Sequence, residues 1–460
     1  MSSSMSSTSR VLPRSLLFVL ASLVIVLSVP GQTAGVSAFT GPLLDAMSMS
    51  RAQLSLAYLI GTITSALMLT PAGKVYDRLG SRVTGTGVSV ALALSLVGLT
   101  QAPQALSMLD STGLPTAASA LIIMSLGFFL IRFFGQGLMP LVGRTMILKW
   151  FDDKRGAVSA VLGSVVPLAF AVAPPVFNGL IGSYGMTGAW LIIAAILCPG
   201  LALVVAFTFS DPPADYQPPV SSPDKEPGLI LRLASGSRSV AARVGRRVGL
   251  RPSKEPMRPE RDIALAEARR SLAFWVFLLV VTLSSGLITG LTFHVVAVFA
   301  EAGIGATAAL AVFFPASLIS VLVTPIASVA SDRLPLKYFA MIHAAALAIL
   351  LISMPLLAFG PAAYAVLVVS KGVALAMFAV NHTVVWPRFF GLEHLGSISG
   401  YSAAWFVAGS ALGPYLFSLS VDLTGSFWGV SYAFVPICLA LLLLGTRADN
   451  PNIRKPRQAN

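Results

Sequence analysis

The sequence predicts an all-α membrane protein whose twelve transmembrane helices form two pseudo-symmetric six-helix bundles. Three observations lead to this fold class: the chain is strongly apolar, its apolar runs have the length of membrane spans, and its second half repeats features of the first. Of the 460 residues, 56% are hydrophobic and 11% are charged, whereas soluble domains carry about 25% charged residues. Most of the chain must therefore face lipid rather than water.

The internal repeat is visible in the charged residues. An offset of 239 residues places Lys149-Trp150-Phe151 over Arg388-Phe389-Phe390, and Arg132 over Lys371. A second offset, of 255 residues, aligns Asp77-Arg78-Leu79 with Asp332-Arg333-Leu334. A longer loop near 101–116 in the first half accounts for the difference. We therefore expect one six-helix bundle at 1–210, a second at 271–460, and a linker at 211–270 between them.

The first span follows a polar, Ser-rich start with two arginines. Residues 15–30 are apolar, and the run continues to Phe39 without the small-x-small site at which a signal peptide is cleaved. Eleven further runs have about the 20 residues that cross a bilayer. They lie at about 52–73, 83–101, 117–143, 156–181, 187–209, 271–299, 305–330, 338–359, 361–386, 396–420 and 425–446.

Basic residues mark the loops of one side of the membrane. Those loops carry Lys74, Arg78, Arg82, Lys149, Lys154, Arg155, Arg333, Lys337 and Arg388, whereas the loops of the other side carry Arg51. Because cytoplasmic loops are enriched in Lys and Arg, this bias predicts that both termini are cytoplasmic. We expect a multi-pass protein of the plasma (inner) membrane.

The linker at 211–270 is the longest polar stretch. It begins with the Pro-rich DPPADYQPP, which suits an extended connector. Its remainder, LILRLASGSRSVAARVGRRVGLR, is typical of a basic amphipathic helix on an anionic leaflet or of a disordered basic linker. Both interpretations stay open, and we expect no transport role for this segment.

Several classes of function have no support in the sequence. There is no His/Cys/Asp/Glu cluster with metal-ligand spacing and no P-loop, so we expect no enzyme activity, cofactor or metal. The net charge of +13 falls in short loops between apolar runs rather than in a basic domain, which argues against nucleic-acid binding. Cys198 and Cys438 lie in apolar runs, where a thiol behaves as a small hydrophobe.

Two basic residues lie deep inside apolar runs. Arg132 is near the middle of the fourth run, and Lys371 is at the related position of the tenth. A cation at mid-membrane costs on the order of 2.5 to 3.5 kcal/mol on insertion scales. Every Asp and Glu, in contrast, falls in a loop, at a terminus or at a span end. We therefore expect Arg132 and Lys371 to bind an anionic substrate, by ion pairing or by bidentate hydrogen bonds to the guanidinium.

Each cation has a second interpretation. Arg132 can bond backbone carbonyl groups of neighbouring helices, and Lys371 can sit neutral in a dry site or extend to an interface. Other polar groups in the spans are candidate substrate contacts, although each can instead serve helix packing. They are Gln32, Thr33, Asn381, Tyr401 and Trp405.

Proton coupling requires a titratable group in the membrane. Besides Lys371, the sequence offers His294 and His382. His294 lies seven residues before Glu301 and hence on the same helix face, which makes it the proton-coupling candidate. A structural, hydrogen-bonded histidine is the other interpretation. Exchange of one anion for another needs no such group, so proton symport and anion exchange both remain open.

Three motifs carry a resemblance to a known family. Gly73-Lys-Val-Tyr-Asp77-Arg78-Leu-Gly80-Ser-Arg82 resembles the loop signature G-x-x-x-D-R-x-G-x-R of the major facilitator superfamily. Ser331-Asp332-Arg333-Leu334 resembles its weaker second copy, and Arg132-Phe-Phe-Gly135-Gln-Gly137 resembles the fourth-helix arginine motif. The resemblance implies a major facilitator fold with a midplane site, alternating access and a monomeric protein.

The loop signature also has a direct physical interpretation. Asp77, beside Arg78 and Arg82, can make charge-assisted hydrogen bonds across the two bundles in one access state and release them in the other. A cluster that only sets orientation in the membrane is the alternative. The expected gating residues are Gly73, Asp77, Arg78, Arg82, Asp332 and Arg333.

A finer resemblance runs from Gly143 to Trp190. The segments WFDDKRG at 150–156 and YGMTGAW at 184–190 are similar to patterns of the monocarboxylate and oxalate/formate branch. The position of that branch's eighth-helix arginine is Thr324 here, and its associated acid falls at Ser320. We expect a secondary transporter of a small organic anion, a mono- or dicarboxylate. A drug or amphipathic-compound exporter is the alternative, and a non-transporting receptor or scaffold is a third possibility.

Overall fold

The computed structural model describes residues 12–111, 113–151, 155–213 and 261–451. Most of the predicted linker, 214–260, lies outside these residues, so both interpretations of it stay predictions. The described elements are all helices. Those of the first half are α1 (Arg14–Val26), η1 (Val29–Gly31), α2 (Thr33–Ser37), α3 (Thr40–Met47), α4 (Arg51–Thr100), α5 (Ala102–Asp110), α6 (Thr116–Ile131), η2 (Arg132–Leu138), α7 (Met139–Trp150), α8 (Arg155–Ala195), η4 (Ile196–Leu201) and α9 (Ala202–Thr208).

The second half continues the pattern after a short helix. Its elements are α11 (Leu265–Ala268), α12 (Leu272–Phe293), α13 (Val295–Glu301), α14 (Ala306–Ala311), α15 (Phe313–Ser331), α16 (Lys337–Ser353), η5 (Leu357–Phe359), α17 (Pro361–Phe390), α18 (Leu395–Thr424) and α19 (Trp428–Gly445).

The described helices account for twelve spans, because two of the long helical stretches each contain two spans. Among the described residues nine stretches are long and apolar enough to cross a membrane, and α16 is a shorter apolar helix. Two of the nine, 51–100 and 161–208, have 50 and 48 residues. At 1.5 Å per residue each is far longer than a hydrocarbon core of about 30 Å. Gly80 and Gly185 interrupt them with positive φ angles of 76° and 70°, which mark the two reversals.

The predicted boundaries are less accurate than the predicted number of spans. Residues 74–82, expected as a loop, are helical on both sides of Gly80. The first run is not one continuous helix, because the 3₁₀ turn at Val29–Gly31 separates α1 from α2. The fourth span is continuous from Thr116 to Trp150 but is π-helical at Arg132–Leu138.

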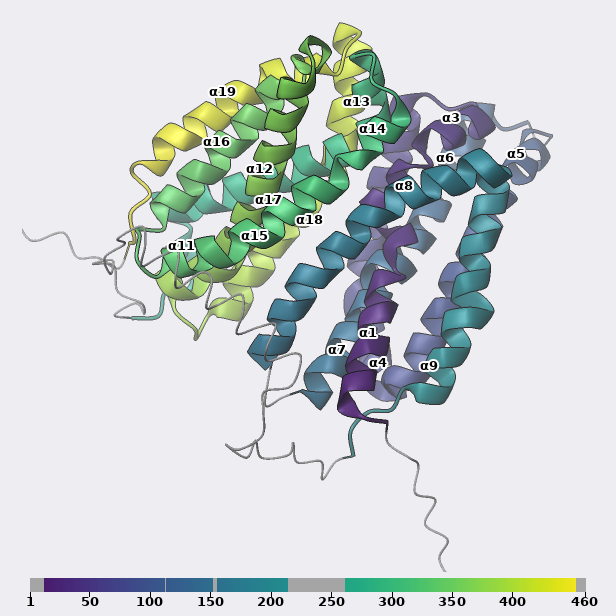
Figure 1. Ribbon diagram of the computed structural model, residues 1–460, viewed down its shortest axis with the longest axis horizontal. Helices are drawn as coiled ribbons and strands as arrows, with labels where there is room; N and C mark the ends of the chain where they lie inside the picture. Colours follow the sequence, from purple (N-terminus) through teal and green to yellow (C-terminus); the bar gives the residue numbers. More distant parts are fainter. Residues whose placement is uncertain (1–11, 112, 152–154, 214–260, 452–460) are drawn as a thin grey trace, which may run out of the picture.

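The helices form two bundles that meet at one side of the molecule (Figure 1). In the first bundle α4 packs on α6 and α1 on α7, and in the second α12 packs on α18 and α15 on α17. Figure 1 shows the bundles in contact near α3, α13 and α14, and their helices diverge toward the end at which α1 begins. We call the end near α3, α13 and α14 the closed side, and the end at which α1 begins the termini side.

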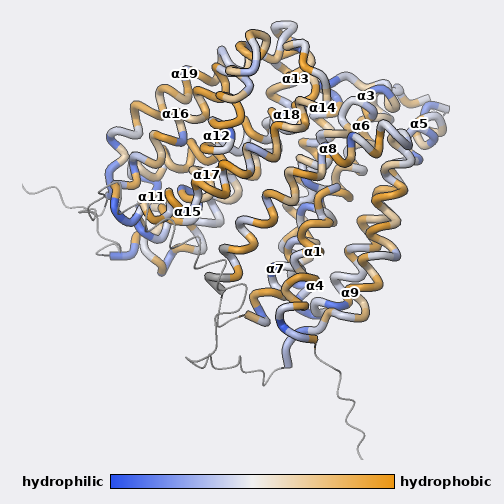
Figure 2. The backbone as a smooth tube through the Cα atoms, in the orientation of Figure 1, coloured by the Kyte–Doolittle hydropathy of each residue, from blue (hydrophilic) through white to orange (hydrophobic). Residues whose placement is uncertain are grey.

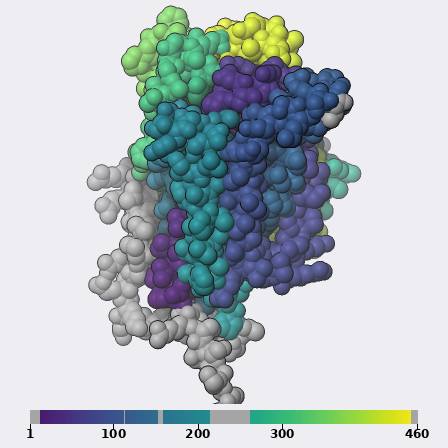
Figure 3. All heavy atoms as spheres, turned by 90° about the vertical axis from the view of Figure 1, so that its right-hand side faces the viewer, coloured from purple at the N-terminus to yellow at the C-terminus, as the bar shows by residue number. Residues whose placement is uncertain are grey.

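Side-chain polarity follows this arrangement. In Figure 2 the hydrophobic colour runs along the helices, and hydrophilic residues gather at their ends and turns. Many large apolar side chains remain exposed, among them Leu67 (69%), Leu94 (64%) and Phe207 (81%). Such a surface is stable only against lipid, so the structure supports an integral, multi-pass membrane protein. Figure 3 shows α9 standing beside α4 on the outer face of the first bundle.

Candidate functional site

Arg132 lies at the start of the π-helical stretch Arg132–Leu138, with none of its surface exposed. Its Nη1 donates to the Gly31 carbonyl oxygen at 3.3 Å and to Thr33 Oγ1 at 3.1 Å. Its guanidinium carbon lies 4.8 Å from the centre of the Tyr58 ring. Nε and Nη2 have no hydrogen-bond partner among the described residues. The predicted bond to a backbone carbonyl is therefore present, and two further donors remain for another partner.

The break at the first span positions the partners of Arg132. The η1 turn ends at Gly31, and α2 begins at Thr33, so the Gly31 carbonyl and the Thr33 hydroxyl both meet the guanidinium. Gln32, between them, donates from Nε2 to Ser28 Oγ at 3.3 Å. Of the two residues predicted here, Thr33 touches Arg132 and Gln32 bonds within its own turn.

Lys371 lies in α17 with 2% of its surface exposed. Its Nζ is 4.3 Å from the centre of the Phe313 ring of α15 and has no hydrogen-bond partner in the described parts of the chain. The neighbouring Gly372 lets α17 approach α15 closely, because a Cβ there would lie 2.7 Å from the Ala316 carbonyl oxygen. Lys371 thus has no carboxylate partner among the described residues of its own bundle.

The structure does not bring the other predicted contacts together around Arg132. Asn381 is buried between α17 and α16, donating to the Phe339 carbonyl oxygen at 3.3 Å, with His343 Nδ1 at 3.2 Å. Tyr401 and Trp405 belong to an aromatic cluster at the start of α18, where the Trp405 ring lies 6.0 Å from that of Trp275. All three residues make contacts within the second bundle.

His294 lies at the closed side, where the bundles meet. Its Nε2 is 3.0 Å from the Pro414 carbonyl oxygen and 3.1 Å from both Ser55 Oγ and Ser418 Oγ. Because a carbonyl oxygen only accepts, this geometry places a proton on Nε2. Ser55 belongs to the first bundle, so His294 is a hydrogen-bonded histidine of the bundle interface. Glu301 lies on the same side and accepts from the Phe427 N–H at 3.0 Å.

His382 is in a different environment. Its ring lies 5.8 Å from the Phe378 ring and 4.9 Å from the Phe406 ring, and Nδ1 has no partner among the described residues. The structure gives it no contact with Lys371 or with His294.

The loop signature lies at the termini side, but its own carboxylate, Asp77, makes no polar contact there with the described residues. Asp77 and Arg78 are exposed, and among the described residues neither side chain makes a hydrogen bond or an ion pair. Asp332 is likewise exposed and Arg333 is half-buried, and their side chains make no such contact with the described residues either. Arg82 donates from Nε to the Phe209 carbonyl oxygen at 2.6 Å, and Gly73 is a plain helical residue. The predicted contacts across the bundles are thus not formed in this conformation, and gating by these residues stays a prediction.

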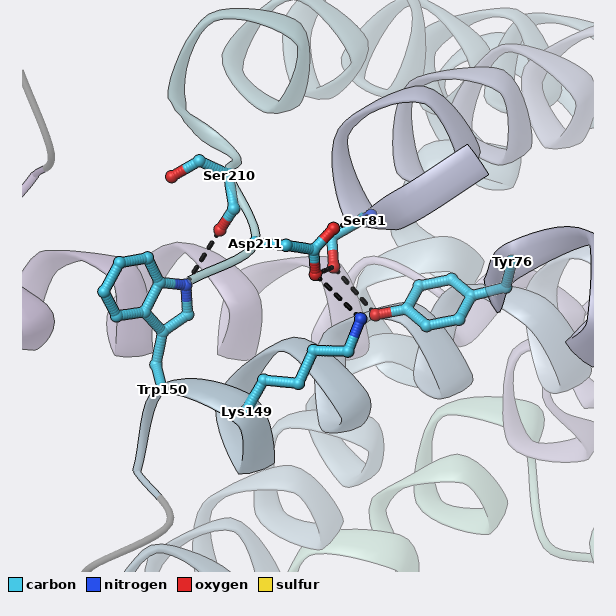
Figure 4. Close-up of polar contacts among 6 residues, drawn as sticks. All are labelled: Tyr76, Ser81, Lys149, Trp150, Ser210 and Asp211. Atoms are coloured by element: carbon cyan, nitrogen blue, oxygen red, sulfur yellow. Dashed lines mark hydrogen bonds and ion pairs between the residues drawn. The ribbon is translucent and has the colours of Figure 1, made fainter. Parts of the chain in front are cut away.

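Asp211, which the sequence-based predictions did not include, is a carboxylate that does make polar contacts at this side (Figure 4). It accepts from the Ser81 backbone N–H and hydroxyl, both at 2.7 Å, and from Lys149 Nζ at 2.9 Å. Burial alone raises the pKa of Asp211, but the hydrogen bonds from Ser81 and the charge of Lys149 outweigh it and hold that pKa below its ordinary value. An acid directly after the sixth apolar run, on the basic side, was the signal in the sequence.

The second bundle has a similar carboxylate contact. Asp262 Oδ1 accepts from the backbone N–H groups of Leu392 at 2.7 Å and Glu393 at 3.2 Å. Both N–H groups directly follow Gly391, whose φ is 88°, as Ser81 follows Gly80. The two ends of the central linker are therefore each bound to a glycine turn of the adjacent bundle.

Comparisons with known proteins agree with this architecture. The model of the Major Facilitator Superfamily matches residues 21–414. A bacterial homologue of the human lysosomal transporter Spinster, solved in an inward-facing and unoccupied conformation, aligns with a TM-score of 0.64 over 98% of this chain and all of its own, at 14% identity. A D-xylose–proton symporter aligns with a TM-score of 0.61 over 96% and 99% of the two chains, also at 14% identity. No curated protein matches the sequence.

These structural likenesses show the fold, and the family match covers most of the chain. Together with the two six-helix bundles and the apolar surface, they identify a membrane transporter rather than an enzyme. The chain belongs to the Major Facilitator Superfamily.

Proposed function

We propose that this protein is a secondary transporter of a small organic anion, a mono- or dicarboxylate, working by alternating access. The observation that supports it best is that Arg132 and Lys371, two buried cations deep inside their apolar runs, have nitrogen atoms without a hydrogen-bond partner among the described residues. None of the described aspartate and glutamate side chains is buried. The positive charge inside the bundles is thus uncompensated by the residues described.

The energetics favour an anion as the missing partner. Holding two unpaired cations at mid-membrane costs about 5 to 7 kcal/mol on the insertion scale. A carboxylate that pairs with them offsets part of that cost and fits the fork geometry of a guanidinium. The resemblance to the monocarboxylate and oxalate/formate branch points to the same substrate class. The sugar in the name of the D-xylose symporter is not transferred to this chain, because the two share the fold at 14% identity.

The remaining parts of the proposal concern coupling and orientation. His294 is the candidate for proton coupling, since it is a histidine that bonds residues of both bundles where they meet, and exchange with a counter-anion is the other mode. The basic loops orient both termini toward the cytoplasm of a plasma (inner) membrane. The closed side then faces outward, and the protein works as a monomer in the bilayer.

A thermal-shift screen of the purified protein tests the substrate class. Formate, lactate, oxalate and succinate are compared with glucose and with the lipophilic cation tetraphenylphosphonium, because a ligand that binds the native state stabilises it. At a concentration of about 100 times its Kd, a carboxylate adds about 2.7 kcal/mol to the free energy of unfolding. We expect this stabilisation in wild type and its loss in Lys371→Gln and Arg132→Gln.

The matched control is Lys74→Gln, which removes an exposed cation of the termini side. It should respond like wild type. Should Arg132→Gln fail to fold, Arg132→Lys keeps the charge but removes the guanidinium fork. Stabilisation by glucose or tetraphenylphosphonium alone would refute the organic anion as substrate. An unchanged carboxylate response in Lys371→Gln and Arg132→Gln would refute the two cations as its binding site.

A further inference from the structure

One face of α4 contacts both the Arg132 site and the opposite bundle. Ser55 and Tyr58, three residues apart, lie on that face. Both are completely buried. Their contacts reach in two directions: toward Thr33 and Arg132 within the first bundle, and toward α12 and α18 in the second.

On the side of α4 that faces Arg132, Tyr58 contacts both the guanidinium and Thr33, which is a hydrogen-bond partner of that guanidinium. Its hydroxyl is 2.7 Å from Thr33 Oγ1, the oxygen that accepts from Arg132 Nη1 at 3.1 Å. Its ring lies 4.8 Å from the guanidinium carbon, within the range of a cation–π contact. Any anion that draws the guanidinium away therefore changes both contacts of Tyr58.

Toward the second bundle, Tyr58 touches the residue that precedes His294. The Tyr58 ring centre is 4.7 Å from that of Phe293. Ser55, one turn away, is 2.6 Å from Ser418 Oγ and 3.1 Å from His294 Nε2. We call these five residues, Ser55, Tyr58, Phe293, His294 and Ser418, the seam.

We propose that Tyr58 is a positioning residue that couples anion binding at Arg132 to the opening of the seam. This inference rests on the proposed function. A ligand shifts a conformational equilibrium only by its difference in affinity for the two states. Here the affinity for the anion differs between the two states because Tyr58 contacts both the Arg132 guanidinium and Thr33. Tyr58 is held in that position by its packing against Phe293, which exists only while the seam is closed.

A distance measurement across the closed side tests the coupling. Asp45 in α3 and Asp422 in α18 are exposed and belong to different bundles. Spin labels on Asp45→Cys and Asp422→Cys, in a background with Cys198→Ser and Cys438→Ser, report their separation in proteoliposomes. The probes are lactate and oxalate, each at a concentration that saturates the variant, so that a change in affinity does not affect the reading.

Tyr58→Phe removes the hydroxyl and keeps the ring against Phe293. We expect lactate or oxalate to shift the distance distribution in the labelled parent protein, and Tyr58→Phe to show less than about a third of that shift. Tyr364→Phe is the matched control: its hydroxyl donates to the Ala308 carbonyl oxygen at 3.2 Å, within the second bundle. It should retain the full shift. Thr33→Val, which breaks the same link from the other end, replaces Tyr58→Phe if the latter does not fold.

The outcomes separate the two proposals. A full shift in Tyr58→Phe overturns the coupling role and leaves anion transport standing. A parent protein that binds lactate or oxalate in the thermal-shift assay without any change of distance also overturns the coupling. Absence of carboxylate binding in that assay refutes the proposed function, and the coupling role with it.

Discussion

Gly31 and Gly135 meet with their backbones in contact. A Cβ on Gly31 would lie 2.6 Å from the Gly135 Cα and 2.2 Å from the Ile131 carbonyl oxygen. Real Cβ atoms do not approach backbone so closely. This contact brings the Gly31 carbonyl oxygen within 3.3 Å of Arg132 Nη1. The position of the guanidinium therefore depends on the close backbone packing that these two glycines allow.

The first prediction follows from that contact. Gly31→Ala and Gly135→Ala should each push the first span away from the fourth and lower the free energy of unfolding by about 1 to 3 kcal/mol, the usual cost of overpacking a core. They should also weaken carboxylate binding by at least about tenfold. Gly41→Ala is the control, because nothing lies within 4 Å of the Cβ position there. Equal stability and binding in all three variants would contradict the prediction.

The second prediction compares two carboxylates of the termini side. Asp211→Asn weakens three hydrogen bonds to a charged acceptor, so we expect a loss of about 1 to 3 kcal/mol in the free energy of unfolding. Asp77→Asn changes an exposed residue and should alter stability by less than about 0.5 kcal/mol. Denaturation of both variants in detergent measures the difference. A loss of less than about 0.5 kcal/mol in Asp211→Asn would mean that the contacts of Asp211 do not stabilise this conformation.

The third prediction concerns pH. The pKa of Asp211 is lower in the folded protein than in the unfolded chain, where it is about 3.9. Its contribution to stability is therefore full above about pH 4 and is lost as the pH falls through the folded pKa. The difference in Tm between wild type and Asp211→Asn should shrink as the pH is lowered from about 6 to about 3. A constant difference over that range would exclude the carboxylate charge as the cause.

The fourth prediction tests the glycine turns that receive the two carboxylates. Gly80 and Gly391 have φ angles of 76° and 88°, where an L-residue is strained by about 1 to 2 kcal/mol. A Cβ would also lie 2.7 Å from Asp211 Oδ2 at Gly80, and 1.9 Å from Asp262 Oδ1 at Gly391. We expect Gly391→Ala to destabilise most and Gly80→Ala next. Gly73→Ala, at an unobstructed helical position, should be neutral or slightly stabilising in the same Tm measurement.

The fold could be predicted because its determinants are local in sequence. Long apolar runs, basic loops and the repeat of Asp77-Arg78 at Asp332-Arg333 require no knowledge of contacts. The helix boundaries were less accurate, because residues 74–79 are polar enough to suggest a loop yet continue α4 as far as Gly80. The composition of a segment predicts where a helix leaves the lipid, but not where the backbone hydrogen bonds of that helix end.

The site could be predicted only in part, for a similar reason. Arg132 and Thr33 stood out as polar groups in apolar surroundings, and the structure joins them at 3.1 Å. Tyr58 did not stand out, because its role comes from partners on three other spans. Asn381 looked like a ligand contact for the same reason as Thr33, but it bonds the backbone of α16. Which polar residues share a site depends on helix packing, which a single sequence does not show.

The two linker carboxylates have opposite positions in the order of synthesis. Asp211 follows the sixth span and binds Ser81, which is made 130 residues earlier. Asp262 precedes the seventh span and binds the N–H of Leu392, made 130 residues later. As the chain leaves the ribosome, the contact of Asp211 with Ser81 thus becomes possible at a moment when all six spans of the first bundle already exist. The second bundle begins with an acceptor whose donors are made later, so the contact of Asp262 can form only after the tenth span has been made.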